Sequence, residues 1–222
     1  MKHSRIFALL GIVLVVEGIM ERGWMLLAVW AGSNCIALGW AMARGKHHLF
    51  GKRPDGSIPP WSCVVFFPFL ATTYAVWNLT RLVRSEPAYN IVNEQLVVGR
   101  RLLPSEWREE CDNYLDLTAE FSEPAALGKL PAYVSFPILD ASAPSPGSLE
   151  ELLRRLKPGR TFVHCAQGHG RTGLVAIAIL LKSGAASTVE EGLQMLKAKR
   201  PAVGINALQR KCAEDYSRAY PQ

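Results

Sequence analysis

The stretch "TFVHCAQGHGRTGL", residues 161–174, carries two phosphate-binding patterns at once. Cys165 and Arg171 are separated by five residues, a spacing that suits a thiolate nucleophile facing a phosphate group. Three glycines of the same stretch also spell G-x-G-x-x-G, which is the pattern of a dinucleotide-binding turn. The two patterns predict different proteins, and the sequence on either side decides between them.

The dinucleotide pattern requires an acidic residue about 20 residues further on, at the end of a second strand. Glu190 and Glu191 lie at nearly the right distance. They fall, however, in the first turn of a predicted helix, where acidic side chains suit the helix dipole. Several elements also precede the glycines, whereas a dinucleotide turn is usually the first of its domain. The sequence therefore disfavours a dinucleotide site.

The cysteine pattern accounts for more of the stretch. The loop after Cys165 can curl so that its backbone N–H groups converge on one point, and a helix beginning near Arg171 directs its positive end to the same point. Glycines at two loop positions permit the unusual dihedral angles of such an anion nest. The predicted phosphate-binding residues are Ala166, Gln167, Gly168, His169, Gly170 and Arg171.

Each remaining polar residue of the stretch has an expected role. The amides, the helix end and the guanidinium all favour a thiolate at Cys165. Arg171 offers a planar fork for two phosphoryl oxygens. Thr172 is placed to hydrogen-bond the sulfur, and His164 is expected to order the loop rather than to act as a base.

From about residue 89 onward the chain alternates predicted strands and helices. Strands are predicted in "YNIVNEQLVVG", "YLDLTAE", "AYVSFPILD" and "RTFVHC", with β-branched and aromatic enrichment. Helices are predicted in "SLEELLRRLKPG", after the loop, in "STVEEGLQMLKAKRP" and in "NALQRKCAEDYSRAY". This alternation predicts an α/β domain over 89–222, with a mostly parallel sheet covered on both faces by helices.

With these residues in view, "HCAQGHGRTG" resembles the H-C-x5-R-S/T signature loop of the cysteine-based phosphatases. The surroundings resemble the dual-specificity branch over roughly Asn90 to Tyr220, including "LVVG", "FPILD", "SLEELL" and "KRPAVGINALQ". The resemblance implies the cysteine-phosphatase fold and a two-step reaction through a phosphocysteine on Cys165. Arg171 and the loop amides would hold the three equatorial oxygens.

The resemblance also implies a general acid that later acts as the base activating water. In the family this is an aspartate on the loop after the "FPILD" type of strand, and Asp140 matches that position. Asp116, in "YLDLTAE", is the nearby rival and has the position of a strand-end residue. No metal and no cofactor are expected.

The loop interior bears on the substrate. It lacks the lysines that phosphoinositide phosphatases of this superfamily often carry, and His169 would supply a partial positive charge at mildly acid pH. We therefore expect a dual-specificity phosphatase of phosphotyrosine, phosphoserine or phosphothreonine in proteins. The alternatives are a phosphatase of a membrane lipid phosphate, of phosphatidylglycerophosphate or phosphoinositide type, and a non-catalytic phosphate-binding module.

The first 88 residues predict a membrane region, with helices over about 6–20, 24–42 and 61–82. The last two contain uncharged runs long enough to cross a bilayer, with tryptophan near their ends. The first is shorter and resembles a signal peptide, but no cleavage site follows. We expect it to form a hairpin with the second helix through Glu21–Gly23, with an interfacial helix as the alternative.

The charges bear on location and partners. Residues 1–89 carry 9 basic and 4 acidic side chains, whereas residues 90–222 carry 16 and 15, which argues against a nucleic-acid partner. The positive-inside rule would place the second domain outside with three membrane helices, and on the side of the N-terminus with two. We expect an integral protein of the inner or plasma membrane, with a cytoplasmic catalytic domain. The five cysteines are isolated, which suits a reducing compartment.

Overall fold

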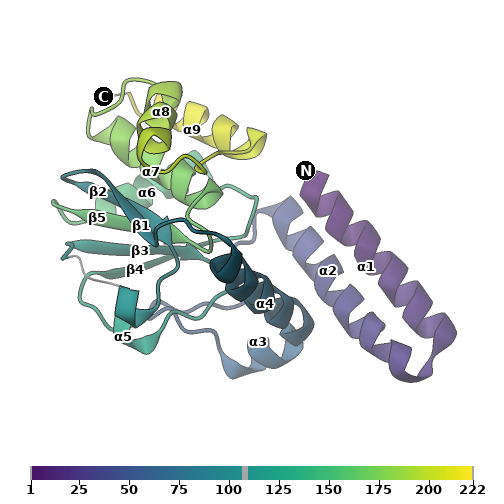
Figure 1. The fold of residues 1–222 in the computed structure, drawn as a ribbon. Coiled ribbons are helices and arrows are strands. Elements are labelled where there is room, and N and C mark those ends of the chain that lie inside the picture. Colours follow the sequence, from purple (N-terminus) through teal and green to yellow (C-terminus); the bar gives the residue numbers. More distant parts are fainter. Residues whose placement is uncertain (1, 107–109, 222) are drawn as a thin grey trace.

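A five-stranded sheet lies at the centre of the second part of the chain in the computed structural model, which describes residues 2–106 and 110–221 (Figure 1). The strands run in the order β1-β2-β5-β3-β4. β1 is antiparallel to β2, and the other pairs are parallel, so the predicted mostly parallel sheet is confirmed. The strands are β1 (Tyr89–Asn93), β2 (Leu96–Arg100), β3 (Asn113–Thr118), β4 (Tyr133–Ile138) and β5 (Thr161–Cys165).

One strand prediction was wrong. The stretch "YNIVNEQLVVG" forms two antiparallel strands rather than one edge strand. Asn93 Oδ1 accepts a hydrogen bond from the backbone N–H of Gln95 (3.0 Å), a side-chain turn that reverses the chain between β1 and β2.

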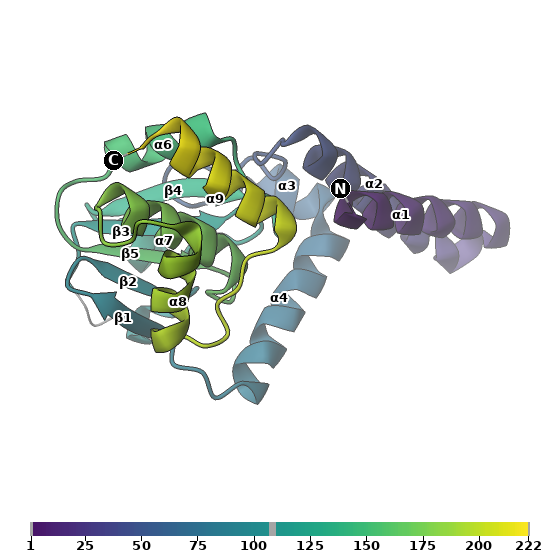
Figure 2. The same ribbon diagram turned by 90° about the horizontal axis from the view of Figure 1, so that it is seen from above.

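Helices cover the sheet as expected. The longer helices of this part gather over one face of the sheet (Figure 2), and an apolar core fills the space beneath. They are α6 (Pro146–Arg155), α7 (Gly170–Lys182), α8 (Val189–Lys199) and α9 (Ala207–Ala219). On the other side, the short α5 (Ala125–Gly128) adds Leu127 to a second apolar cluster around Phe162 and Tyr114. α7 is the central element, because most of its side chains are buried.

The N-terminal part begins with a long hairpin of α1 (Lys2–Glu21) and α2 (Leu26–Arg44), joined through η1 (Gly23–Met25). The two helices pack closely through glycine. A Cβ on Gly11 would lie 2.6 Å from the carbonyl oxygen of Gly32, and one on Gly39 would lie 2.8 Å from that of Ser4. Small residues of this kind let membrane helices approach each other.

The outer surface of this hairpin is apolar. Leu9 and Leu27 are each 63% exposed, and Trp40 is 53% exposed. Within the described residues, these two helices are long and apolar enough to cross a membrane, and only 11% and 28% of their spans are buried. That exposure is unlike the core helices of a soluble protein, whose apolar side chains are mostly covered.

The third membrane helix, expected over 61–82, is interrupted. The chain forms α3 (Pro60–Val65) and then α4 (Phe67–Val83), with the break at Phe66. Pro68 lies in the first turn of α4, where its missing N–H is tolerated, so it begins a helix instead of continuing one.

α4 packs against the α/β domain and crosses the direction of the hairpin steeply (Figure 2). Its Trp77 is 4% exposed, and the Tyr74 and Phe121 rings meet edge-on with their centroids 4.7 Å apart. The guanidinium of Arg101 lies over the Trp77 ring at 4.9 Å. Part of the sequence expected to lie in lipid is therefore attached to the α/β domain.

Candidate active site

The end of β5 and the start of α7 frame the predicted loop. Cys165 is the last residue of β5 and is 3% exposed, in the middle of the sheet between β2 and β3. Gly168 has φ 75°, and a Cβ there would lie 2.4 Å from the Gly99 carbonyl, so the loop needs glycine at this position. Gly170 is different: it is the first residue of α7, and a Cβ there would meet the Gln209 amide at 3.2 Å.

Arg171 is fixed in place by a bidentate ion pair. Its Nη1 and Nη2 donate to Glu120 Oε2 (2.8 Å) and Oε1 (2.7 Å), and Nη1 also donates to the Ile138 carbonyl (2.9 Å). The side chain is 2% exposed. Although burial lowers it, the carboxylates of Glu120 and Asp140 hold the pKa of Arg171 well above its usual range.

Glu120 was not predicted from the sequence. It lies two residues beyond β3, and Arg171 lies in the first turn of α7, just after the loop that follows the neighbouring β5. Because the carboxyl ends of parallel strands meet at one edge of a sheet, an acidic residue just after a strand is a signal that could have identified it.

Asp140, the predicted general acid, lies near Arg171. It follows β4, its side chain is 81% exposed, and its Oδ1 is 3.3 Å from Nη2 of Arg171. Asn206 Nδ2 donates to the Ala141 carbonyl (2.9 Å), which attaches this loop to the start of α9. The rival, Asp116, is fully buried and paired with Lys52, so it is shielded from a substrate.

A second arginine, which lies outside the loop after Cys165, donates hydrogen bonds to the backbone of that loop. Arg200, which follows α8, donates from Nε to the Gly168 carbonyl (3.1 Å) and from Nη2 to the Gln167 carbonyl (3.0 Å). The backbone N–H of Arg101 donates to the Ala166 carbonyl (3.3 Å). These bonds occupy loop carbonyls, so that loop N–H groups can face an anion. Arg200 was missed, although it stands in the quoted segment "KRPAVGINALQ".

His169 and Thr172 are two further residues for which the sequence predicted a side-chain role. His169 Nε2 lies 2.8 Å from Glu86 Oε2, so this ring contacts an acid outside the loop. Burial lowers the pKa of His169, and Glu86 opposes that shift. Thr172 is fully buried, and its Oγ1 has no hydrogen-bond partner within the part of the chain that the structure describes. Its contact with the sulfur stays a prediction.

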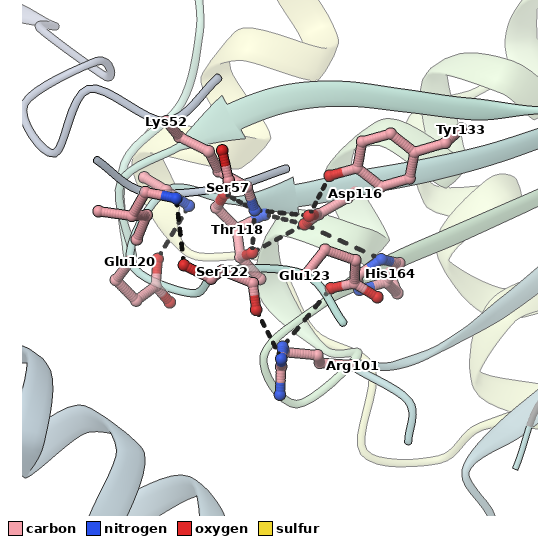
Figure 3. Close-up of polar contacts among 12 residues, drawn as sticks. Lys52, Ser57, Arg101, Asp116, Thr118, Glu120, Ser122, Glu123, Tyr133 and His164 are labelled. Carbon is pink, nitrogen blue, oxygen red and sulfur yellow. Dashed lines mark hydrogen bonds and ion pairs between the residues drawn. The ribbon is translucent and has the colours of Figure 1, made fainter. Parts of the chain in front are cut away.

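A second charged cluster lies around Asp116 and His164, the residue before Cys165 (Figure 3). Asp116 accepts hydrogen bonds from Lys52 Nζ (2.5 Å) and from the Tyr133 hydroxyl (2.8 Å). Its Oδ1 is 3.9 Å from Nε2 of His164, which is fully buried. Ligand atoms of Asp116, Glu123 and His164 lie within 4.8 Å of one another, a spacing that would suit a metal, but the Lys52 ammonium already neutralises Asp116.

Comparison with known proteins identifies the fold. No protein-family model matches this sequence, and no curated protein matches it. Tk-PTP in its active form is 21% identical, with a TM-score of 0.52 over 60% of this chain and 99% of that one. A glycine-to-alanine mutant form of Tk-PTP is 26% identical, with the same TM-score, over 60% and 96%. PTPMT1 in complex with PI(5)P is 14% identical, with a TM-score of 0.47, over 60% and 96%.

The matched share of this chain is close to the size of the part from residue 89 to the C-terminus. The chain therefore has the cysteine-phosphatase fold, as its loop sequence predicted. Cys165 ends the strand and Arg171 lies in the first turn of the helix of a strand–loop–helix unit in this fold. The Arg171 guanidinium is paired with Glu120. Fold and loop are those of a cysteine-dependent phosphatase, an enzyme that hydrolyses phosphoric monoesters.

Proposed function

We propose that this protein is a membrane-anchored phosphomonoesterase that works through a phosphocysteine on Cys165. The observation that supports this most directly is the fixed geometry of Arg171, whose guanidinium is held by Glu120 beside the nucleophile loop. A planar guanidinium oriented before substrate arrives can bind two phosphoryl oxygens without reorganisation.

The proposed reaction has two steps. The Cys165 thiolate forms an S–P bond while the P–O bond to the leaving group breaks, and Asp140 gives its proton to the departing oxygen. The Asp140 carboxylate then takes a proton from water as the water oxygen bonds to phosphorus. The S–P bond breaks, inorganic phosphate leaves, and the thiolate is restored. Arg171 and the loop amides hold the equatorial oxygens in both steps.

We infer the membrane side from the two helices that are long and apolar enough to span a bilayer. If α1 and α2 both cross the bilayer, the N-terminus and the α/β domain share one side. The exposed basic residues near that boundary are Arg5, Arg44 and Lys46, which favour the cytoplasmic side. Lys52 is buried in the protein and is not a topology signal. We infer a cytoplasmic catalytic domain on an inner or plasma membrane.

For the substrate we propose a phosphoprotein, with phosphotyrosine, phosphoserine or phosphothreonine as the reacting group. The exposure of Asp140 supports a site open enough for a side chain of another protein. A lipid phosphate is the second candidate, and a specific contact favours it. His47, three residues after α2 ends, lies 3.3 Å from the backbone N–H of Leu139, which precedes Asp140. The site therefore stands close to the point where the hairpin would leave the bilayer.

The first experiment tests the chemistry with the full-length protein in detergent micelles. We expect hydrolysis of p-nitrophenyl phosphate in the presence of EDTA, and loss of that activity in Cys165→Ser. A folded wild-type protein that binds phosphate but hydrolyses no phosphomonoester would instead indicate a non-catalytic module. Full activity in Cys165→Ser would exclude the phosphocysteine.

The second experiment separates the substrates. Full-length protein is reconstituted and offered phosphotyrosyl, phosphoseryl and phosphothreonyl peptides, vesicles containing phosphatidylglycerophosphate, and vesicles containing phosphoinositides. Peptide turnover well above vesicle turnover supports the protein phosphatase. Turnover confined to one lipid assigns the alternative.

A further inference from the structure

A buried lysine from the N-terminal part contacts β3, the strand that pairs with the strand ending at Cys165. Lys52 belongs to the segment 45–59, which joins α2 to α3, yet its side chain is 1% exposed (Figure 3). Its ammonium donates to Asp116 Oδ2 (2.5 Å), to the Thr118 carbonyl (2.8 Å) and to Thr118 Oγ1 (2.8 Å). An ammonium has three N–H donors, so protein groups use all of them and none remains for a substrate.

The partner of this lysine faces the residue that precedes the nucleophile. Asp116 on β3 is in register with His164 on β5, and both side chains are fully buried. The polar side chains around the imidazole come from every element packed there: Asp116 and Tyr114 of β3, Lys52 of the segment 45–59, Arg101 after β2, and Glu123 after β3.

Burial and two of these neighbours favour the uncharged form of the ring. Burial lowers the pKa of His164 to about 4; Asp116 opposes this shift, and Lys52 and Arg101 add to it. Burial and the nearby Asp116 raise the pKa of Glu123 to about 8, so this acid is protonated at neutral pH and adds little charge. Asp116 is thus the anion that would draw a proton to His164, and Lys52 is the cation that cancels it.

The same segment also reaches the loop that carries the acid. His47 Nδ1 accepts a hydrogen bond from the Leu139 N–H (3.3 Å) and lies 3.4 Å from Ser142 Oγ, on either side of Asp140. The backbone of the segment 45–59 is also attached to the α/β domain, because the Glu123 N–H donates to the Gly56 carbonyl (2.9 Å). One short segment therefore contacts both the acid loop and the support of the nucleophile loop.

We propose that Lys52 is a positioning residue of this active site, which pairs with Asp116 and so keeps His164 neutral beside Cys165. The inference rests on the proposed phosphatase function. In Lys52→Met, Asp116 would remain buried without a counter-ion, and the adjacent imidazole would take up a proton to compensate. An imidazolium would then stand next to the thiolate and change both its reactivity and the shape of the loop.

The test uses full-length protein in detergent and the pH dependence of kcat/KM for p-nitrophenyl phosphate. We expect Lys52→Met to lose about tenfold more activity at pH 5.5 than at pH 8, since one pH unit corresponds to a tenfold change in protonation. The double variant Lys52→Met/Asp116→Asn should regain the wild-type profile, because neither buried charge remains. Arg53→Met, at the neighbouring exposed position, is the matched control and should match wild type.

A second readout does not depend on activity. The ring resonance of His164, identified by its absence in His164→Gln, should stay in the neutral form from pH 5 to 8 in wild type. In Lys52→Met it should titrate near or above the ordinary value of 6.5. If wild type hydrolyses no phosphomonoester, the phosphatase proposal fails, while this titration still decides the role of Lys52.

Two results would overturn the inference. One is an equal loss of activity at both pH values in Lys52→Met with an unchanged His164 titration, which would make Lys52 purely structural. The other result applies if Lys52→Met does not fold. The double variant then carries the test: a folded double variant with the wild-type profile supports the inference, and one with an altered profile contradicts it.

Discussion

Two buried ion pairs take their carboxylates from β3 and from the segment just after it. They differ in how many donors of the cation are used within the protein. Asp116, on β3, holds Lys52, and Glu120, just beyond β3, holds Arg171. All three donors of the Lys52 ammonium are used within the protein. The Arg171 guanidinium keeps an unpartnered Nε among the described residues and extends toward the exposed Asp140.

The number of donors left on each cation determines whether it can bind a further anion. A cation whose donors are all satisfied can only stabilise and tune its surroundings. A cation with spare donors beside an exposed loop can bind an anion. Removing one partner of either pair leaves the other buried charge uncompensated, which typically costs about 3 kcal/mol or more. Activity and stability should therefore separate the two pairs.

The largest expected effect is at Arg171. Arg171→Met should lower kcat/KM for p-nitrophenyl phosphate by about 1,000-fold, because it removes the donors to the equatorial oxygens. Arg210→Met is the matched control, since Arg210 forms only a surface pair with Glu190, and its activity should stay within twofold or so of wild type. A fall of less than about tenfold in Arg171→Met would place the phosphate elsewhere.

Next in size is the effect of Asp140. Asp140→Asn should lower kcat by about 100-fold with little change in apparent binding, since general acid catalysis contributes at least that much. The loss should shrink for p-nitrophenyl phosphate, whose leaving group is acidic, and grow for an alkyl phosphate. An equal loss on both substrates would argue against proton donation by Asp140.

The two carboxylates of the ion pairs give a smaller and more direct comparison. Glu120→Gln should cost about thirtyfold in kcat/KM, roughly 2 kcal/mol, because a hydrogen bond to a charged group is worth about that much. Asp116→Asn should leave the activity near that of wild type, since His164 stays neutral without Asp116. Thermal unfolding in detergent should show both variants destabilised. Greater loss of activity in Asp116→Asn than in Glu120→Gln would reverse the assignment of the two pairs.

The smallest effect is a pH dependence of stability. Burial and Asp116 raise the pKa of Glu123 to about 8, from an ordinary value of 4.5. The folded protein therefore holds a proton that the unfolded chain releases, and the free energy of unfolding contributed by Glu123 falls as pH rises through this window. Glu123→Gln should flatten the fall of the unfolding temperature between pH 5 and 8. The exposed Glu94→Gln serves as control, and a fall that persists in Glu123→Gln would contradict the assignment.

Sequence alone determined what depends on local pattern and motif. The alternation of strands and helices, the hairpin of α1 and α2, and the loop from Cys165 to Arg171 were all predicted, because periodicity and motif spacing are properties of neighbouring residues. Asp140 was predicted through the family resemblance, and the structure places it 3.3 Å from Arg171. The break at Phe66 was the local exception: one helix was predicted over about 61–82, whereas Pro68 lies in the first turn of a new helix.

Tertiary structure alone decided which charges meet. Glu120 and Arg171 are 51 residues apart, Lys52 and Asp116 are 64 apart, and His47 and Leu139 are 92 apart. No local pattern specifies such partners, because burial and pairing depend on which strand ends and connecting segments the packed chain brings together. The motif thus predicted where a phosphate would bind, whereas the folded chain brings Lys52, from the segment after the α1–α2 hairpin, to Asp116 beside the strand that leads into that motif.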